Sequence, residues 1–264
     1  MIFAPRSCPS RPGFAITTLI FRATVDQYRN VRLTVVGCSP SWPNPGRAQS
    51  GYLLESEDGR LLVDCGPGVL SRLREREPWP QVDAIVISHL HLDHCGDLVP
   101  WLWGHLIGPA AGTPAPTLWL PPHGLGRLLS FAPIELFARV FDMRVYEDGV
   151  PFDAGSFHVL PSAVVHYDEP TWGMRIERAG RVVAYSADSA PSSALEELAR
   201  DADVFICEAT LLEPEDDPHG HMTADEARQV FRASGARRLL LTHRAVELPL
   251  DELVYDGFEL ELDP

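Results

Sequence analysis

Alternating hydrophobic and polar positions predict that folded structure begins at residue 31. The segment 31–36 alternates in the way a half-buried strand does. Two further strands, joined by a hairpin turn, are predicted at 51–54 and 60–63. Residues 1–30 contain several prolines and an apolar stretch with neither a helical nor a strand period, so we expect an N-terminal extension without fixed structure.

Further along the chain, short apolar runs alternate with helical patterns, which is typical of layered α/β proteins. Additional strands are predicted at 84–87, 117–120, 143–146, 157–165, 172–177, 181–185, 203–206 and 237–241. Helices are predicted at 69–76 and 97–106, and also where capping-box sequences begin at Ser193 and Thr223. Residues 31–264 are long enough to bury a full core and are predicted to form one domain.

A histidine-rich segment follows directly after the predicted strand at 84–87. It contains His89, His91, Asp93 and His94, whose nitrogen and oxygen donors suit divalent metals. Because histidine alternates with leucine, His89 and His91 lie on the same side of an extended backbone. Asp93 and His94 fall where the chain must turn and can face a second ion. The pattern therefore predicts two metal ions.

Three other predicted strands also end close to a residue that can bind a metal, namely His166, Asp188 and His243. A single histidine at a strand end is more often a structural residue than a ligand. Ligand sites in α/β proteins commonly lie at the carboxyl ends of strands, and the histidine-rich segment leaves coordination positions open. The recurrence therefore favours metal binding by all three residues.

Composition restricts the partners and the compartment. The formal charge of −15 and the pI near 5.0 oppose binding of long polyanions, so a small molecule is a more natural partner than extended nucleic acid. Five cysteines without a C-x-x-C pair indicate neither a disulfide framework nor a thiolate zinc site, which suits a reducing cytoplasm. No apolar stretch approaches the length of a membrane helix.

These residues resemble the metallo-β-lactamase superfamily. The spacing H-x-H-x-D-H matches its signature motif, and the later histidines and aspartate match from residue 31 to about 244. The resemblance implies a four-layer αββα sandwich with the site along one sheet edge. It also implies that one metal is held by His89, His91 and His166, a second by Asp93, His94 and His243, and that Asp188 bridges them.

Asp64 lies in a turn of sequence Asp-Cys-Gly-Pro-Gly. It matches a residue that supports the metal ligands in this superfamily, since ligating histidines need an acceptor for their other ring N–H. A purely turn-forming aspartate beside two glycines is the alternative interpretation.

Two further residues, Glu208 and His221, resemble those of the ribonuclease Z and phosphodiesterase branch. In that branch a glutamate polarises a histidine that contacts the scissile phosphate or its leaving oxygen. The resemblance thus implies a phosphodiesterase that acts through a metal-bridging hydroxide, with Asp93, Glu208 and His221 as catalytic residues. Cys207 departs from the histidine that is usual before this glutamate in ribonuclease Z.

The interval between His166 and Asp188 holds only one predicted hairpin, whereas ribonuclease Z inserts a long arm there that grips transfer RNA. The chain is more similar to small-nucleotide phosphodiesterases of actinobacterial type, which implies a cyclic nucleotide substrate. Ribonuclease Z activity, hydrolysis of other esters, lactones or sulfate esters, and a non-catalytic metal-stabilised binding protein are the alternatives.

Zinc suits the imidazole-rich ligands best, with Mn²⁺ or Fe²⁺ also accommodated. Relatives are often dimeric, so a homodimer is included among the expectations.

Overall fold

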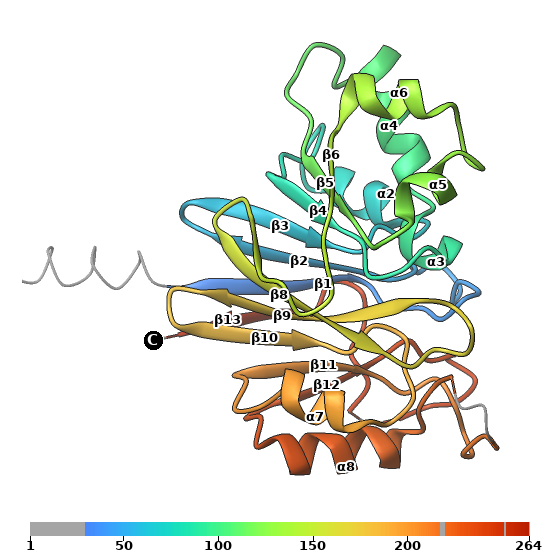
Figure 1. The fold of residues 1–264 in the computed structure, drawn as a ribbon, viewed down its shortest axis with the longest axis vertical. Coiled ribbons are helices and arrows are strands. Elements are labelled where there is room, and N and C mark those ends of the chain that lie inside the picture. The colour runs from blue at the N-terminus through green and yellow to red at the C-terminus, as the bar shows by residue number, and fades with distance from the viewer. Residues whose placement is uncertain (1–29, 217–219, 251, 264) are drawn as a thin grey trace, which may run out of the picture.

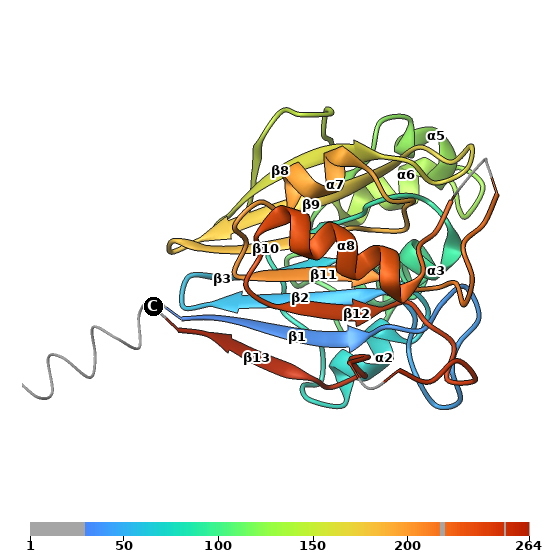
Figure 2. The same ribbon diagram turned by 90° about the horizontal axis from the view of Figure 1, so that it is seen from below.

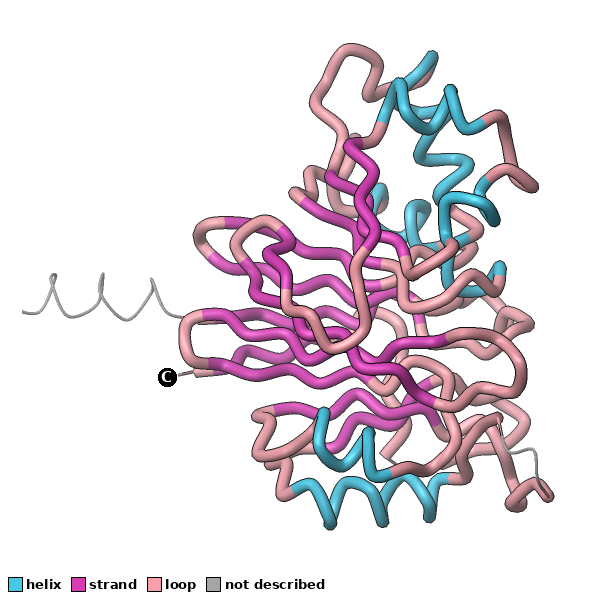
Figure 3. The backbone as a smooth tube through the Cα atoms, in the orientation of Figure 1, coloured by secondary structure: helices cyan, strands magenta, loops and turns pink. Residues whose placement is uncertain are grey.

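The computed structural model describes residues 30–263 apart from 217–219 and 251. The predicted extension at 1–30 therefore lies outside the described residues, except for Asn30. Two β-sheets pack face to face, and helices cover the outer face of each sheet (Figures 1 and 2). Figure 3 shows the strands in the middle of the molecule and the helices on its two outer sides. The predicted four-layer αββα sandwich is thus confirmed.

The first sheet has seven strands in the order β13-β1-β2-β3-β4-β5-β6. Their bounds are β1 (Val31–Gly37), β2 (Gly51–Ser56), β3 (Gly59–Val63), β4 (Ala84–Val86), β5 (Thr117–Leu120), β6 (Asp142–Val145) and β13 (Glu259–Leu262). Its helices are α2 (Val69–Arg74), α3 (Leu92–Cys95), α4 (Leu98–Ile107), α5 (Gly124–Leu128) and α6 (Ile134–Val140). The strands from β3 to β6 pair in parallel, so their carboxyl ends reach the same edge.

The second sheet has six strands in the order β12-β11-β10-β9-β8-β7. Their bounds are β7 (Phe152–Ala154), β8 (Phe157–Val164), β9 (Thr171–Arg178), β10 (Arg181–Tyr185), β11 (Val204–Glu208) and β12 (Leu239–Thr242). Its outer face carries α7 (Ser193–Leu198) and α8 (Ala224–Ser234). No helix in the described part of the chain combines the length and the apolar character needed to cross a membrane.

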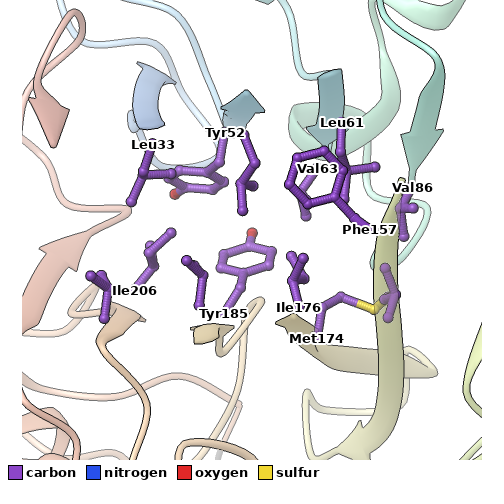
Figure 4. Close-up of a cluster of buried hydrophobic side chains, with 14 of the residues drawn as sticks. Leu33, Tyr52, Leu61, Val63, Val86, Phe157, Met174, Ile176, Tyr185 and Ile206 are labelled. Carbon is purple, nitrogen blue, oxygen red and sulfur yellow. The ribbon is translucent and has the colours of Figure 1, made fainter. Parts of the chain in front are cut away.

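Strand side chains alternate between two apolar layers, as a sheet buried on both faces requires. In β2, Tyr52 and Leu54 enter the core between the sheets, whereas Leu53 packs under the helices of the first sheet. In β11, Ile206 faces the central core and Phe205 faces α7 and α8. Figure 4 shows this central core, with leucine, isoleucine and tyrosine side chains from both sheets.

The helix starts were predicted with mixed success. Thr223 forms the predicted capping box with Glu226 at the start of α8. The helix predicted at Ser193 is α7, which begins at that residue, but Ser192 and not Ser193 is its N-cap and accepts from the backbone N–H of Leu195. Two short strands at sheet edges, β7 and β13, were not predicted.

Candidate metal centre and the neighbouring histidine

The predicted metal ligands come together at the carboxyl ends of four strands. His89 and His91 lie in the loop that follows β4, His91 is the N-cap of α3, and helix α3 itself carries Asp93 and His94. His166, Asp188 and His243 follow shortly after the ends of β8, β10 and β12, respectively. These strand ends are on the side of Figure 1 where α3 lies. The turn predicted at Asp93 and His94 is the short helix α3, which begins at Leu92.

One group of potential ligands consists of His89, His91, His166 and Asp188. The Nδ1 atom of His91 lies 3.1 Å from Nε2 of His89 and 3.1 Å from Nε2 of His166. Neighbouring nitrogen ligands of tetrahedral zinc are about 3.3 Å apart, since each lies roughly 2.0 to 2.1 Å from the ion. The spacing of these three rings therefore suits a single small cation.

A second group consists of Asp93, His94, His243 and again Asp188. Oδ2 of Asp93 is 3.2 Å from Nε2 of His243 and 3.4 Å from Nε2 of His94. Asp188 directs Oδ1 to His94 at 3.3 Å and Oδ2 to His243 at 3.5 Å. The same Oδ2 is 3.9 Å from Nε2 of His89, so the Asp188 carboxylate lies between the two groups.

Asp64 supports this arrangement from behind, and its side chain is fully buried. Its Oδ2 accepts hydrogen bonds from Nδ1 of His94 at 2.7 Å and from the hydroxyl groups of Ser88 and Tyr185, both at 2.8 Å. Because the Ser88 hydroxyl donates to Asp64, its oxygen accepts from Nδ1 of His89 at 3.1 Å. Asp64 thus sets the orientation of two imidazoles, in addition to forming the turn.

Two further ligand rings, those of His166 and His243, are oriented in the same way by other acceptors. His166 donates its Nδ1 proton to the carbonyl of Gly220 at 2.8 Å. Thr210 donates its hydroxyl to Oε2 of Glu208, so its oxygen accepts the Nδ1 proton of His243 at 2.9 Å.

In His89, His94, His166 and His243 the outward Nδ1 carries the proton, and the inward Nε2 presents a lone pair. His91 differs, because its Nδ1 is the nitrogen that faces Nε2 of His89 and His166. This donor set fits metal ions. The histidine and aspartate clusters are therefore consistent with a binuclear metal site.

Burial and neighbouring charges shift the pKa values of these side chains in different directions. Burial lowers the pKa of His89, which favours the neutral form that binds metals. Burial opposes a charge on Asp188, but His243 and His94 hold the pKa of its carboxyl well below the usual range. For His94, burial is outweighed by Asp188 and Asp64, which raise its pKa, so protons and metal ions compete for this ring.

Glu208 and His221 form the predicted pair beside the metal groups. Nδ1 of His221 donates to Oε1 of Glu208 at 2.8 Å, and the backbone N–H of Ser189 donates to the same oxygen at 2.6 Å. The His221 ring centroid is 4.7 Å from that of His166 and 5.8 Å from that of His243. Burial alone would lower the pKa of His221, but the Glu208 carboxylate outweighs it and raises the pKa to about 9.

Several residues of this site were not predicted. Thr210, Ser88 and Tyr185 carry hydroxyl groups that complete the hydrogen bonds of the ligand histidines or of Asp64. Thr210 belongs to the Cys-Glu-Ala-Thr segment that indicated Glu208, and that proximity was the available signal. The carbonyl of Gly220 had no signal in the sequence, since any residue supplies a carbonyl.

The fold and site define a member of the metallo-β-lactamase superfamily. The family model "Beta-lactamase superfamily domain" matches residues 59–244, and the chain belongs to this family. The chain is 34% identical over 219 residues to "Probable metallo-hydrolase YhfI" of Bacillus subtilis, covering 81% of this chain and 86% of that protein. It is also 26% identical over 302 residues to a ribonuclease Z of Myxococcus xanthus, covering 88% of this chain and 98% of that protein. It therefore falls in the branch that contains YhfI and ribonuclease Z.

Solved structures show the same fold. The crystal structure of YhfI from Bacillus subtilis superposes with a TM-score of 0.79 at 26% identity, covering 88% of this chain and 99% of YhfI. A diphosphatase from the PhnP family superposes with a TM-score of 0.71 at 21% identity, covering 88% of this chain and 98% of that one.

Proposed function

We propose that this protein is a metal-dependent hydrolase that cleaves a phosphodiester bond in a small nucleotide of the cyclic nucleotide class. The observation that carries the proposal is the pair of Glu208 and His221 placed beside two groups of metal-binding side chains. The groups would hold two divalent ions, with Zn²⁺ favoured by the imidazole-rich donor set and Mn²⁺ or Fe²⁺ also compatible.

The metal ions, when bound, supply Lewis acidity toward the phosphoryl oxygens. The ligands would be His89, His91 and His166 for one ion, Asp93, His94 and His243 for the other, and Asp188 for both.

The role of the protein's own residues follows from the hydrogen bonds around Glu208. The carboxylate fixes the orientation of His221 through Nδ1, and among the described residues Nε2 of His221 has no hydrogen-bond partner. A protonated imidazole held in this way can donate from Nε2 to the leaving oxygen or stabilise the negative charge that develops on it. The side chain of His221 is 16% exposed, so a substrate can reach it.

Two features support a small substrate over an RNA. The interval between His166 and Asp188 contains only the hairpin of β9 and β10, with no inserted arm. The chain carries a formal charge of −15, which opposes the approach of a long polyanion. The diphosphatase and ribonuclease Z relatives both act on phosphate esters or anhydrides by their names, which agrees with phosphorus chemistry in this branch.

The test is an assay of the metal-loaded protein on bis-p-nitrophenyl phosphate and on cyclic AMP. We expect turnover of both, lost on chelation and restored by added metal. Absence of metal-dependent turnover of either substrate contradicts the proposal. A panel of lactone and sulfate-ester substrates in the same assay distinguishes other hydrolases of the superfamily, and tight metal binding without turnover of any substrate indicates a binding protein.

Ribonuclease Z activity is the second candidate, favoured by the similarity to the Myxococcus xanthus protein. Cleavage of a 3′-extended transfer RNA separates the two functions. We expect no cleavage at physiological salt, where cyclic AMP is hydrolysed.

A further inference from the structure

A cavity of about 610 Å³ opens beside the candidate metal centre, and the proposed chemistry makes no use of it. His91 and Asp93 form its metal side, so a phosphate at the metal centre lies at its edge. Other parts of its wall are formed by Ser41, from the loop between β1 and β2, and by Gly126, Arg127, Ser130 and Phe131. Its volume falls within the roughly 300 to 1,000 Å³ that is usual for small-ligand sites.

Apolar side chains provide part of the lining. Leu90 is buried, while Leu92 is 61% exposed although it lies between two predicted metal ligands at the start of α3. Phe131, which follows α5, adds an aromatic ring to the same cavity. A flat aromatic ligand that covered these side chains would remove apolar surface from water.

Arg127 is the one cation among the lining residues. Its Nη2 atom lies 3.3 to 3.4 Å from the two carboxylate oxygens of Glu169, whose side chain is only 18% exposed. Glu169 is itself held in a turn, because its backbone N–H donates to the carbonyl of His166. The Arg127 side chain is 56% exposed, and the ion pair places its guanidinium at the wall of the cavity that also contains His91 and Asp93.

This charge balance decides which part of a substrate the cavity suits. The Glu169 carboxylate beside Arg127 offsets part of the positive charge, so the attraction of the cation for a second phosphate is weakened. A neutral, planar group with hydrogen-bond acceptors on its edge is less affected by this offset. It can lie against Phe131 and accept from the planar guanidinium of Arg127.

We propose that this cavity binds the nucleobase of the substrate, with Phe131 and Leu92 against the base and Arg127 donating to its edge. The inference rests on the proposed function for the placement of the phosphate at the metal centre. It makes these three residues determinants of specificity, separate from the residues that act on the phosphate.

The first experiment compares two substrates with the same leaving group, the p-nitrophenyl ester of thymidine 5′-phosphate and methyl p-nitrophenyl phosphate. For Phe131→Ala and Arg127→Gln we expect kcat/KM for the thymidine ester to fall about 5- to 100-fold, the range typical of a lost base–aromatic contact. Turnover of the methyl ester should change less than twofold, which also shows that the variants fold. The matched control is Leu129→Ser, since Leu129 is 58% exposed but does not line the cavity.

Equal losses on both esters, or no loss on either, overturn the cavity assignment.

A binding experiment separates this outcome from failure of the proposed function. Calorimetry on the metal-loaded protein compares adenosine 5′-phosphate with ribose 5-phosphate, which differ by the base alone. We expect tighter binding of the nucleotide by the wild type and loss of that advantage in Phe131→Ala, even if neither ester is hydrolysed. Equal affinity for the two ligands, or no binding of the nucleotide, rules out a base site here.

Discussion

Two buried carboxylates, Asp64 in the first half of the chain and Glu208 in the second, organise the site from opposite sheets. Both accept several hydrogen bonds and both are at most 1% exposed. Asp64 receives its donors from His94, Ser88 and Tyr185. Glu208 supports a predicted ligand through Thr210, but it also binds His221 directly. Asp64 therefore orients only predicted metal ligands. Glu208 orients a predicted ligand and also His221, whose imidazole is partly exposed.

The difference follows from where the two carboxylates lie. Asp64 follows β3 and connects to the core through Tyr185, whose ring packs against Tyr52 with centroids 4.8 Å apart (Figure 4). Glu208 ends β11 at the sheet edge, next to the segment that carries Gly220 and His221. We infer that disturbance at Asp64 changes metal binding, whereas disturbance at Glu208 changes catalysis as well.

The largest effect is expected for His221→Ala. Removal of the imidazole that is proposed to donate to the leaving oxygen should lower kcat about 10² to 10⁴-fold on cyclic AMP. Metal content, measured by elemental analysis, should not change, because His221 is outside both predicted ligand groups. The loss should be much smaller on bis-p-nitrophenyl phosphate, whose leaving group needs no proton. A similar loss on both substrates together with loss of metal would contradict the distinction drawn between the two carboxylates.

Glu208→Gln should produce the next largest effect. The amide cannot accept all the donors that the carboxylate accepts, so the orientation of His221 is weakened and kcat should fall about 10- to 100-fold. We propose that Glu208 acts through His221. Glu208→Gln should therefore lower kcat much less in the His221→Ala background than in the wild type. Full additivity of the two losses in this double-mutant cycle would show that Glu208 acts independently of His221.

Asp64→Asn tests the other side of the comparison. Asp64 has a φ of 58°, a conformation that asparagine tolerates, so the backbone should be retained. The amide replaces an acceptor of His94 and Tyr185, and we expect metal affinity to fall about 10- to 100-fold. Competition with a chromogenic chelator measures this loss, while kcat at saturating metal should stay within a few-fold of wild type. A large fall in kcat with unchanged metal affinity would reverse the roles assigned to the two carboxylates.

Side chains with distinctive chemistry were predictable from the sequence, including the carboxylates Asp64 and Glu208, whereas the hydroxyl and carbonyl groups that complete their hydrogen bonds were not. The spacing of His89, His91, Asp93 and His94 after an apolar strand indicated a metal site because few other functions need so many donors so close together. Thr210 completes the hydrogen bond of His243, yet threonine is common and its role depends on the loop after β11. The orientation of each ring therefore became visible only in the folded chain.

The strands likewise divide into those that were predictable from the sequence and those that were not. Those with β-branched and leucine-rich runs, such as β1 and β11, were predicted because burial on both faces requires apolar residues. β13 has the sequence ELEL and lies at the edge of the first sheet, beside β1. Edge strands gain their structure from pairing with a neighbour, so a short alternating run of this kind carries little signal of its own.

A further buried carboxyl, Asp97, lies outside both metal groups and provides the smallest predicted effect. Its Oδ2 accepts from the backbone N–H of Leu70 at 2.8 Å, and burial raises its pKa to about 6. Between pH 4 and pH 6 the folded protein therefore binds more protons at this residue than the unfolded chain does. The contribution of Asp97 to the free energy of unfolding falls as the pH rises through this window and is constant above it.

Asp97→Asn removes this titration while it keeps an acceptor for Leu70. Relative to this variant, the wild type should lose about 1 to 3 kcal/mol of unfolding free energy between pH 4 and pH 7. Urea unfolding in the presence of a chelator measures the difference without the contribution of metal binding. A difference that does not vary with pH would show that the hydrogen bonds to Asp97 compensate its burial fully.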